Sequence, residues 1–386
     1  MRLLTVSHFF EDHGGGVERV AARLNAEFAR MGHQAVWAAS DADPAPDGGI
    51  EAVPLRCANP TERLTGLPMP IPGPAAIRAL ARAVRASDAV IVHDTLYVTS
   101  ILATLLAKAR GKPVVLIQHI AGIPFRHRAL RVLMRVANRL VTRPMLGAAD
   151  RLVFISDAVR RALIGEPARR PFTLAYNGVD TAIFHPRAAT DEEATRLVHG
   201  LPADAPLALV VGRFVEKKGL AVVEALARRR PDLHVALVGA GPIRPEGWHL
   251  PNVHVLGPQT QARVAALYRA ADLLLLPSVG EGYPLVVQEA MACGLPVICG
   301  ADSARADPQA SQWLRGVEID LAYPVASAAR CDAAIEALRA RPIDAAAMTA
   351  YAARRYSWRG MAEAIVACVS EPVEALDRAS RRLQAR

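Results

Sequence analysis

The sequence predicts an α/β protein built from two doubly wound domains, each with a parallel sheet covered by helices. Short apolar runs alternate along the chain with stretches of helical periodicity, and this alternation is typical of parallel strands joined by crossover helices. The series is interrupted once and starts again near residue 207. A chain of 386 residues is also too long for one ordinary core and suits two domains of roughly 180 residues each.

The elements of the first domain follow in order from the amino terminus. Residues 3–7 predict a strand, residues 17–31 predict a helix that ends at Gly32, and residues 34–39 predict a second strand. Residues 42–74 are rich in Pro and Gly and are expected to form a long loop. Three further apolar runs predict buried parallel strands, at residues 89–92, 114–118 and 152–155.

The second domain repeats the alternation. Its apolar runs predict five strands, at residues 207–211, 234–238, 253–256, 273–276 and 297–299. Between residues 181 and 206 the pattern is broken by prolines and by an acidic run at 191–193, which is the composition of a linker. We therefore expect a first domain over residues 1–185 and a second domain over residues 206–358.

The composition describes a folded protein with reduced thiols. Hydrophobic residues make up 52% of the chain and charged residues 22%, which excludes a disordered chain. The five cysteines are scattered, odd in number and without metal-ligand spacing, so we expect free thiols in a cytoplasmic protein. The first apolar run is too short for a signal-peptide core, and no stretch reaches the ~20 apolar residues of a membrane span.

The net charge of +9 comes mainly from arginine, which is abundant throughout the chain. One cluster stands out, formed by Arg126, Arg128, Arg131, Arg135, Arg139 and Arg143. Spacings of three and four place the middle members on one stripe of a helix, with apolar residues between them. Such a basic amphipathic helix fits either an anionic membrane surface or an ordinary solvated face, and both interpretations stay open. Nucleic acid is not an expected partner, because no recognition motif or aromatic platform accompanies the charge.

Two carboxylates within residues 281–294 form the most informative motif of the chain. Glu281 precedes a Gly-Tyr-Pro turn, and Glu289 lies eight residues later in an apolar segment that predicts a helix over residues 284–293, stopped by the next glycine. Along an uninterrupted helix that separation is about 12 Å, too far for the two acids to flank one bond as a hydrolase pair. A loop before the helix lets both acids face one extended ligand.

Three further segments accompany this motif in a fixed order. Residues 14–18 form a glycine loop followed by an acid, residues 177–180 read Asn-Gly-Val-Asp, and residues 212–219 hold three cations between two glycines. Together the four segments resemble the family-four retaining glycosyltransferases, which have the GT-B fold. The resemblance implies two Rossmann-like domains facing each other across a cleft, and a carboxy-terminal helix, residues 359–386, that returns to pack on the first domain.

Arg213 and Lys218 carry the charge chemistry that the resemblance implies. Arg213 follows a predicted strand and Lys218 precedes a helix that begins near Gly219, so a loop between them lets the two cations converge. Transfer of a sugar from a nucleoside diphosphate leaves two negative phosphates, which two cations and a helix N-terminus stabilise without a metal. We therefore expect no metal and no cofactor, and we expect the nucleotide sugar as a co-substrate.

The two glutamates are expected to hold the donor at two places. By resemblance, Glu289 accepts hydrogen bonds from the ribose hydroxyls and Glu281 contacts the hydroxyls of the donor sugar, and a carboxylate suits such vicinal diols. The backbone amides that complete the donor site are those of Gly282, Tyr283 and Leu285. Pro284 stands where many relatives carry Gly, and it lacks an N–H that could have met the sugar or the phosphate.

The first domain contributes a glycine loop and polar residues that follow its strands. Gly15 and Gly16 lack a Cβ, so the backbone can approach the diphosphate or the acceptor closely. His119 follows a predicted strand and matches the family's active-site histidine, which holds a donor hydroxyl or stabilises positive charge near the anomeric carbon. His93 and Asp94 follow another strand and are expected on the acceptor side. No general base emerges, which suits a retaining reaction in which the leaving phosphate takes the acceptor proton.

The expected function is transfer of a hexose from a nucleotide sugar to an acceptor hydroxyl with retention, in polysaccharide, lipopolysaccharide or glycolipid synthesis. The expected catalytic residues are His119, Arg213, Lys218 and Glu281. A catalytically silent nucleotide-sugar-binding subunit and a GT-B sugar-nucleotide epimerase stay open as alternatives. A phosphorylase is disfavoured, because it needs a pyridoxal-phosphate lysine and the second domain has lysines only in its phosphate loop.

The donor base, UDP or GDP, and the acceptor stay open. We expect a cytoplasmic enzyme, placed on the inner face of the membrane if the basic helix binds lipid.

Overall fold

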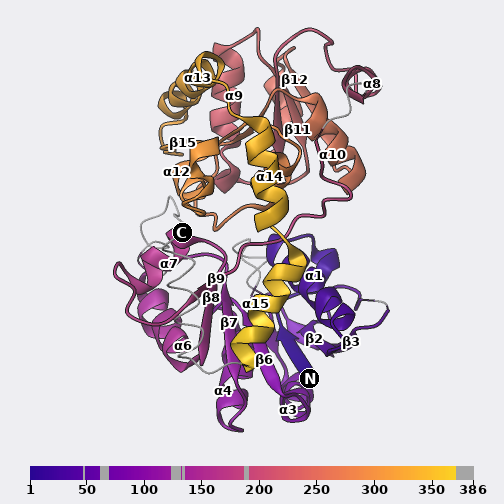
Figure 1. Ribbon diagram of the computed structural model, residues 1–386, viewed down its shortest axis with the longest axis vertical. Helices are drawn as coiled ribbons and strands as arrows, with labels where there is room; N and C mark the ends of the chain where they lie inside the picture. The colour runs from indigo at the N-terminus through magenta and orange to yellow at the C-terminus, as the bar shows by residue number, and fades with distance from the viewer. Residues whose placement is uncertain (47, 61–68, 123–131, 133–134, 187–190, 371–386) are drawn as a thin grey trace. The chain divides into compact units, whose positions relative to one another are not determined.

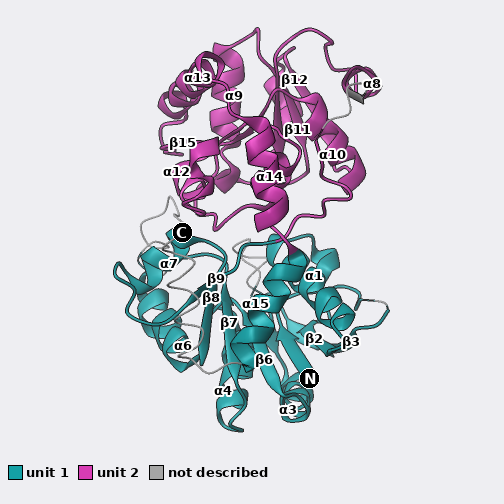
Figure 2. Ribbon diagram, viewed as in Figure 1, with its two compact units in different colours: residues 1–177, 358–386 teal, residues 178–357 magenta. Residues whose placement is uncertain are grey.

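The computed structural model describes the chain except for residues 47, 61–68, 123–131, 133–134, 187–190 and 371–386. It divides into two compact units, coloured separately in Figure 2. Unit 1 comprises residues 1–177 and the carboxy-terminal segment that begins at Trp358, and unit 2 comprises Gly178–Ser357. Each unit contains its own parallel sheet packed against helices (Figure 1), so the predicted α/β class with two doubly wound sheets is confirmed.

The sheet of unit 1 has seven strands in the order β3-β2-β1-β6-β7-β8-β9. In chain order these strands are β1 (Arg2–Val6), β2 (Gln34–Ser40), β3 (Glu51–Leu55), β6 (Ala89–His93), β7 (Val114–Gln118), β8 (Arg151–Phe154) and β9 (Thr173–Leu174). Successive side chains of a strand point to opposite faces, and here both faces are buried. Leu4 packs in the core on one face of the sheet and Leu3 in the core on the other.

The segment of residues 42–74 is not one long loop, and that expectation was wrong. It contains the edge strand β3, which pairs with β2, and a short antiparallel pair, β4 (Cys57–Ala58) and β5 (Ile71–Pro72). Pro54 lies within β3 and weakens the strand signal in the sequence. An edge strand tolerates proline, because one of its sides has no ladder to donate to.

Helices cover both faces of the unit 1 sheet (Figure 1). They are η1 (Glu11–His13), α1 (Gly16–Arg30), α3 (Pro74–Ala86), α4 (Val98–Lys108), the π-helix η2 (Asn138–Thr142), α6 (Arg143–Ala148), α7 (Asp157–Ile164) and α15 (Trp358–Ser370). Helix α1 is followed by Gly32 in the left-handed region, at φ 79°, which supplies the predicted stop. Helix α15 packs Met361 and Ile365 into the core that α1 covers.

The sheet of unit 2 has six strands in the order β12-β11-β10-β13-β14-β15. In chain order the strands are β10 (Leu207–Val211), β11 (His234–Val238), β12 (Val253–Gly257), β13 (Leu273–Leu276), β14 (Val297–Gly300) and β15 (Leu314–Val317). The helices are α8 (Asp191–Val198), η3 (Glu216–Lys218), α9 (Leu220–Arg229), η4 (Pro245–Trp248), α10 (Gln261–Ala270), α11 (Leu285–Ala292), α12 (Ala301–Ala304), η5 (Ala310–Trp313), α13 (Pro324–Ala340) and α14 (Ala345–Arg355). The five predicted strands are present, and β15 adds a sixth.

The change from unit 1 to unit 2 comes at Gly178, earlier than the expected linker over residues 181–206. Helix α8 lies within that expected linker but packs on α10 of unit 2. Its buried Arg196 donates through Nε to the Ala270 carbonyl and forms an ion pair with Asp272 at 3.2 Å. Because these contacts of Arg196 are made to residues of unit 2, they fix α8 to that unit. The composition of the segment did not indicate this.

In the part of the chain that the structure describes, no helix combines the length and the apolar character needed to cross a membrane. The five cysteines carry free thiols, and four of them are buried. Burial raises the pKa of the Cys57 thiol to about 11 and that of Cys299 to about 12. These thiols are therefore protonated and weakly nucleophilic at neutral pH.

Candidate functional site

The residues of the two unit 2 motifs lie in loops that touch each other. Strands β10 and β13 are neighbours in the sheet, so the loops that follow them leave the same carboxyl edge. The Val279 amide donates to the Lys217 carbonyl at 2.9 Å. Gly219 has φ 73°, and a Cβ there would overlap the Pro277 carbonyl oxygen, so only glycine allows this approach. The sequence separated these motifs by about sixty residues, and the sheet brings them together.

Lys217 and Lys218 form ion pairs with Glu281 across the two loops. The Lys218 ammonium lies 3.1 Å from Glu281 Oε1, and the Lys217 ammonium lies 3.5 Å from the same oxygen. Burial acts to raise the pKa of Glu281, but the charges of Lys218 and Lys217 outweigh it and hold that pKa below its ordinary value. Glu281 is therefore ionised at neutral pH, and the loops keep more positive than negative charge.

Arg213 and Lys218 share one loop, as the sequence predicts. The side chain of Arg213 is exposed, while the loop turns through η3 and the left-handed Gly219 before α9 begins. The aliphatic part of Lys218 folds back beside Gly212, with its Cε about 3.5 Å from where a Cβ of that glycine would stand. The lysine head therefore lies near the start of the loop that also carries Arg213.

Glu289 lies in the second turn of α11 and is nearly buried, with 6% of its surface exposed. Its Oε2 accepts a hydrogen bond from the Tyr268 hydroxyl at 3.1 Å, which orients the carboxylate. The helix begins at Leu285, one residue later than predicted, because Pro284 has extended backbone (ψ 131°) and serves as the N-cap. Gly294, at φ 78°, provides the predicted stop.

Tyr283 anchors the loop between the two glutamates. Its hydroxyl lies 2.7 Å from that of Tyr356, which in turn donates to Asp307 Oδ2 at 3.0 Å. Tyr351 donates to the same carboxylate oxygen at 2.7 Å. Burial, followed by the neighbouring Tyr283 and Asp307, raises the pKa of Tyr356 well above its ordinary value. The Tyr283 side chain thus faces the core of unit 2 and holds the loop to it.

His119 and His93 form a buried pair at the carboxyl edge of the unit 1 sheet. His93 is the last residue of β6 and His119 follows β7, and these strands are neighbours. His93 Nδ1 lies 2.9 Å from His119 Nε2. Burial is the largest cause that lowers the pKa of each ring, and for His119 the charge of Asp94 opposes it. Both imidazoles are therefore neutral at neutral pH.

Asp94 and His93 do not form the open acceptor wall that the sequence predicts. His93 is 0% exposed and Asp94 is 3% exposed. Asp94 adopts a left-handed backbone (φ 56°), and its Oδ1 accepts the His119 amide at 2.8 Å. Both polar side chains are turned toward His119, because a buried polar group takes the nearest partner that satisfies it. We therefore correct their role from lining a pocket to holding His119.

His8 and Glu18 complete the polar group of unit 1, and the sequence interpretation gave neither of them a role. His8 Nε2 lies 2.8 Å from Glu18 Oε1, and the His8 ring stacks on Tyr97 with centroids 3.8 Å apart. Burial acts to raise the pKa of Glu18, but the hydrogen bond and charge of His8 outweigh it and leave that pKa lowered. A polar residue directly after the first strand and an acid in the first turn of the next helix were the available signals.

The two glycines of the amino-terminal loop differ in their surroundings. A Cβ on Gly15 would overlap the Glu18 carboxylate, so this glycine makes room for the acid that pairs with His8. No atom lies within 4 Å of where a Cβ of Gly16 would stand. Close approach of a ligand, expected for both positions from the sequence, is therefore open only at Gly16.

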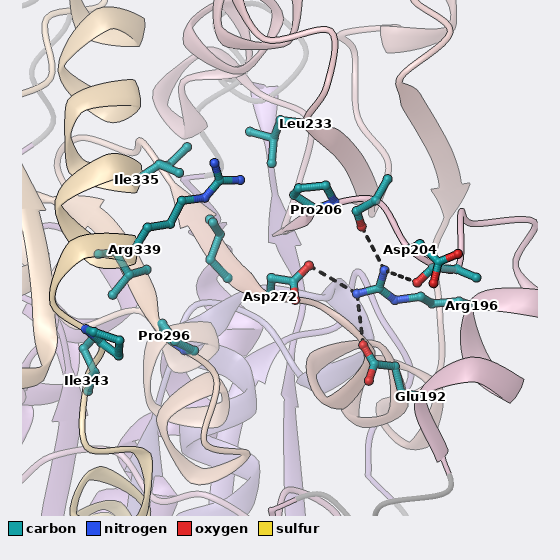
Figure 3. A pocket seen from close by; sticks show the side chains of 15 residues that line it. Glu192, Arg196, Asp204, Pro206, Leu233, Asp272, Pro296, Ile335, Arg339 and Ile343 are labelled. Carbon is teal, nitrogen blue, oxygen red and sulfur yellow. Dashed lines mark hydrogen bonds and ion pairs between the residues drawn. The ribbon is translucent and has the colours of Figure 1, made fainter.

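A cavity of about 500 Å³ lies elsewhere in unit 2 (Figure 3). Pro206, Asp272 and Pro296 line it, and these residues directly precede β10, β13 and β14, so the cavity lies at the amino edge of the sheet. Its buried guanidinium, that of Arg196, already donates to backbone carbonyls and pairs with Glu192 and Asp272. None of the motif residues lines this cavity, so it is not the site that the sequence predicts.

Two family models match regions of the chain. A family model described as Glycosyltransferase Family 4 matches residues 14–183, and a model described as Glycosyl transferases group 1 matches residues 205–313. The chain belongs to the family 4 glycosyltransferases. The two matched regions contain every predicted site residue.

Curated relatives of this family 4 glycosyltransferase share part of its length. D-inositol 3-phosphate glycosyltransferase from Mycobacterium avium (strain 104) is 31% identical over 242 residues, which cover 57% of this chain and 54% of the relative. The protein of the same name from Mycobacterium bovis (strain BCG / Pasteur 1173P2) is 34% identical over 169 residues, covering 40% and 34%. The chain thus matches about half the length, or less, of these relatives.

Solved structures show the same fold as this family 4 glycosyltransferase. HepE from Anabaena in complex with UDP and glucose has a TM-score of 0.66 at 19% identity, covering 96% of this chain and all of the other. Sucrose-phosphate synthase from Thermosynechococcus elongatus also has a TM-score of 0.66 at 19% identity, covering 100% and 98%. At such identity the likeness concerns the fold, which is GT-B.

Proposed function

We propose that this family 4 glycosyltransferase transfers a sugar from a nucleoside diphosphate sugar to an acceptor hydroxyl. The observation that carries the proposal is the pair of touching loops in unit 2, where Lys217 and Lys218 flank Glu281 and Arg213 stands exposed in the same loop as the lysines. Three cations against the two carboxylates of Glu216 and Glu281 leave net positive charge for a diphosphate, and the Glu281 carboxylate suits sugar hydroxyls. HepE, which shares the fold, binds UDP and glucose, so UDP sugars are the first donors to test.

Arg213 and Lys218 are proposed to stabilise the diphosphate as it leaves. Negative charge grows on the phosphate oxygens when the bond to the sugar breaks, and fixed cations lower the barrier most when they face that charge. Arginine offers a planar fork to two oxygens, whereas lysine offers a compact charge. Helix α9 begins at Leu220, directly after the lysines, and adds the partial positive charge of its N-terminus. These groups support metal-independent chemistry.

Glu281 and Glu289 are proposed to hold the donor by its hydroxyls. Glu281 stays ionised beside the lysines and retains lone pairs for hydroxyl donors beyond its ion pairs. Glu289 is oriented by Tyr268 and offers a carboxylate to the ribose. The anchored loop between them presents the amides of Gly282, Tyr283 and Leu285 to the donor.

The reaction is proposed to retain the anomeric configuration, with the leaving phosphate taking the acceptor proton. Two carboxylates near the carboxyl edge of the unit 1 sheet, those of Glu18 and Asp94, support this, because both already have partners. Glu18 is paired with His8, and Asp94 accepts the His119 amide. Neither is therefore proposed as a general base.

The acceptor is proposed to be a sugar or lipid-linked hydroxyl of polysaccharide, lipopolysaccharide or glycolipid synthesis. Among proteins of the same fold, WaaG is involved in lipopolysaccharide biosynthesis, with a TM-score of 0.67 at 17% identity. The curated relatives are named for D-inositol 3-phosphate. A phosphorylated cyclitol is therefore the second acceptor class to test.

Peripheral binding to an anionic membrane is part of the proposal. Arg126, Arg128 and Arg131 of the basic cluster lie outside the described residues. The remaining members, Arg135, Arg139 and Arg143, are exposed at intervals of four. Between them lies an apolar stripe of the same spacing, formed by Val132, Val136 and Leu140, which are 49%, 46% and 67% exposed. Cations beside exposed apolar side chains suit an interfacial helix.

The donor proposal is tested by titrating the full chain with UDP and GDP sugars and following nucleoside diphosphate release. We expect slow release with the correct donor and faster release when acceptor is added. Arg213→Ala is expected to weaken donor binding at least tenfold, while Arg228→Ala, an exposed arginine of α9 paired with Glu224, serves as control. Equal donor affinity in the two variants would overturn the site assignment. Sedimentation with anionic vesicles, with neutral vesicles as a comparison, tests the membrane part, which fails if the anionic vesicles are not bound at low salt.

A further inference from the structure

The buried pair of His93 and His119 holds one hydrogen between its two facing nitrogens. The hydrogen bond between His93 Nδ1 and His119 Nε2, at 2.9 Å, needs a hydrogen on one nitrogen and a lone pair on the other. Each neutral imidazole carries one N–H, so the position of this shared hydrogen fixes the tautomers of both rings. Two arrangements exist, and they differ in what His119 offers to a ligand.

The surroundings of His93 decide between the two arrangements. His93 is 0% exposed, and its Nε2 has no hydrogen-bond partner among the residues that the structure describes. If His119 donated, His93 would carry its hydrogen on Nε2 and bury an unpaired N–H. If His93 donates, its Nε2 is a bare lone pair, and an unsatisfied acceptor is tolerated better than an unsatisfied donor. The second arrangement therefore has the lower free energy.

We propose that His93 is a positioning residue that donates from Nδ1 to His119 Nε2 and so fixes His119 with its own hydrogen on Nδ1. This rests on the proposed function only in assigning His119 to the donor site. His119 is then a hydrogen-bond donor to an oxygen of the ligand. It has no free lone pair with which to accept the acceptor's proton, and its neutral ring brings no full positive charge to the anomeric carbon.

Asp94 fixes the backbone of His119 as His93 fixes its ring. The left-handed Asp94 turns its Oδ1 toward the His119 amide, at 2.8 Å, directly after the strand that carries His93. The rings of the histidine pair are inclined by only 20°, with centroids 5.1 Å apart. Two adjacent residues thus hold His119 at two points, and neither of them needs to touch the ligand.

The test is the tautomer of His119, read from nitrogen chemical shifts of the full chain labelled with ¹⁵N-histidine. A His119→Gln variant assigns the signals. We expect the hydrogen of His119 on Nδ1 in the wild type, and a mixture of tautomers in His93→Phe. We expect His93→Asn to restore the wild-type form, since its amide places a donor near the former Nδ1. A wild-type His119 with its hydrogen on Nε2 overturns the proposal, even if the variants do not fold.

Kinetics separate a positioning role from a structural one. With a turned-over donor, His93→Phe is expected to lower kcat about tenfold, as loss of an orienting partner of a functional histidine does, and His93→Asn to restore most of it. The control is His234→Phe, which breaks a second histidine pair of the same 2.9 Å length, with His254 in unit 2. Loss of kcat in His93→Phe with an unchanged His119 tautomer contradicts the proposal. If His119 has the expected tautomer but no nucleotide sugar is turned over, the positioning role of His93 is supported and the proposed function is refuted instead.

Discussion

The ammonium of Lys218 lies 3.1 Å from Oε1 of Glu281, and this ion pair joins the two loops that the proposed function assigns to the donor. Lys217 adds a second, longer contact to the same oxygen. The pair means that the cation meant for the phosphates and the carboxylate meant for the sugar are coupled before any ligand is present. A substitution of either one therefore changes how the other meets the donor.

Replacing Glu281 by Gln is expected to separate binding of the nucleotide from transfer of the sugar. The variant removes the negative charge beside Lys217 and Lys218, so a nucleoside diphosphate should bind about fivefold more tightly, which corresponds to about 1 kcal/mol. Transfer should slow, because the sugar loses its carboxylate partner. Calorimetric titration with the nucleoside diphosphate and initial-rate measurements give the two values. Glu216→Gln removes the same charge from an exposed position in the loop. It should change the affinity for the nucleoside diphosphate and the rate of transfer much less. Weaker nucleotide binding in Glu281→Gln would contradict the charge argument.

The Glu18 carboxylate is expected to stabilise unit 1 at neutral pH and to stop doing so in acid. Its folded pKa is lowered below the ordinary value of about 4.3, so its contribution is fully present above that pH and is lost as the pH falls through the folded pKa. Glu18→Gln should therefore reduce the free energy of unfolding by about 1–3 kcal/mol at pH 7, because it takes the buried carboxylate away from His8 Nε2.

The measurement is urea denaturation of the wild type and Glu18→Gln between pH 7 and pH 3. The difference between their free energies of unfolding should shrink as the pH falls below about 4.3. Glu27→Gln offers a control on the same helix, since Glu27 pairs with the exposed Arg30. A difference that stays constant over this range would show that the Glu18 carboxylate contributes through packing and not through its charge.

Gly219→Ala is expected to separate the two donor loops. The added methyl group meets both a left-handed backbone, at φ 73°, and the carbonyl oxygen of Pro277. Gly200→Ala is a matched control, because Gly200 is also left-handed, at φ 63°, but has no atom within 4 Å of where the Cβ would stand. The control should lose about 1 kcal/mol of stability from backbone strain alone. Gly219→Ala should lose about 3 kcal/mol and bind donor poorly. Equal losses by thermal denaturation in both variants would mean that the loops tolerate the methyl group.

Tyr356→Phe is expected to loosen the loop that carries Tyr283. The variant removes the hydroxyl between Tyr283 and Asp307, which should lower the free energy of unfolding by about 1–2 kcal/mol and raise the KM for the donor. Tyr351→Phe is the control, because Tyr351 donates to the same Asp307 oxygen, whereas Tyr356 also hydrogen-bonds Tyr283. Tyr351→Phe should lower the free energy of unfolding by a similar amount and leave the KM for the donor unchanged. If both variants raise the KM equally, the carboxylate and not the tyrosine bridge positions the loop.

The sequence was sufficient for the features that depend on local pattern. The alternation of strands and helices and the stop at Gly294 follow from periodicity and from a glycine placed after a helical run. Features that depend on contacts with residues far along the chain could not be predicted from the sequence. Pro54 concealed a strand because only the finished sheet makes that strand an edge. Arg196 joined the expected linker to unit 2 through carbonyls and an acid far along the chain.

The polar group of unit 1 shows the same division within the site. The position of His119 directly after a strand could be predicted from the sequence, and its role in the site stays a prediction from the family pattern. The burial of His93 could not, because a residue at a strand end faces either a ligand or a neighbouring loop, and the choice depends on which partner lies opposite. The partner is His119 itself, twenty-six residues away in the sequence. The alternation of side chains along a strand does not indicate which residue of a neighbouring loop will lie opposite.

The path of the chain also sets an order of events during synthesis. The core of unit 1 includes Met361, Ala362, Ile365 and Cys368, which leave the ribosome after every residue of unit 2. Unit 2 is one continuous stretch and can fold as soon as it emerges, whereas the first-made part of unit 1 waits with an uncovered apolar face. The amino-terminal unit is thus the last to be completed, and a chain cut after residue 177 would keep that face exposed to aggregation.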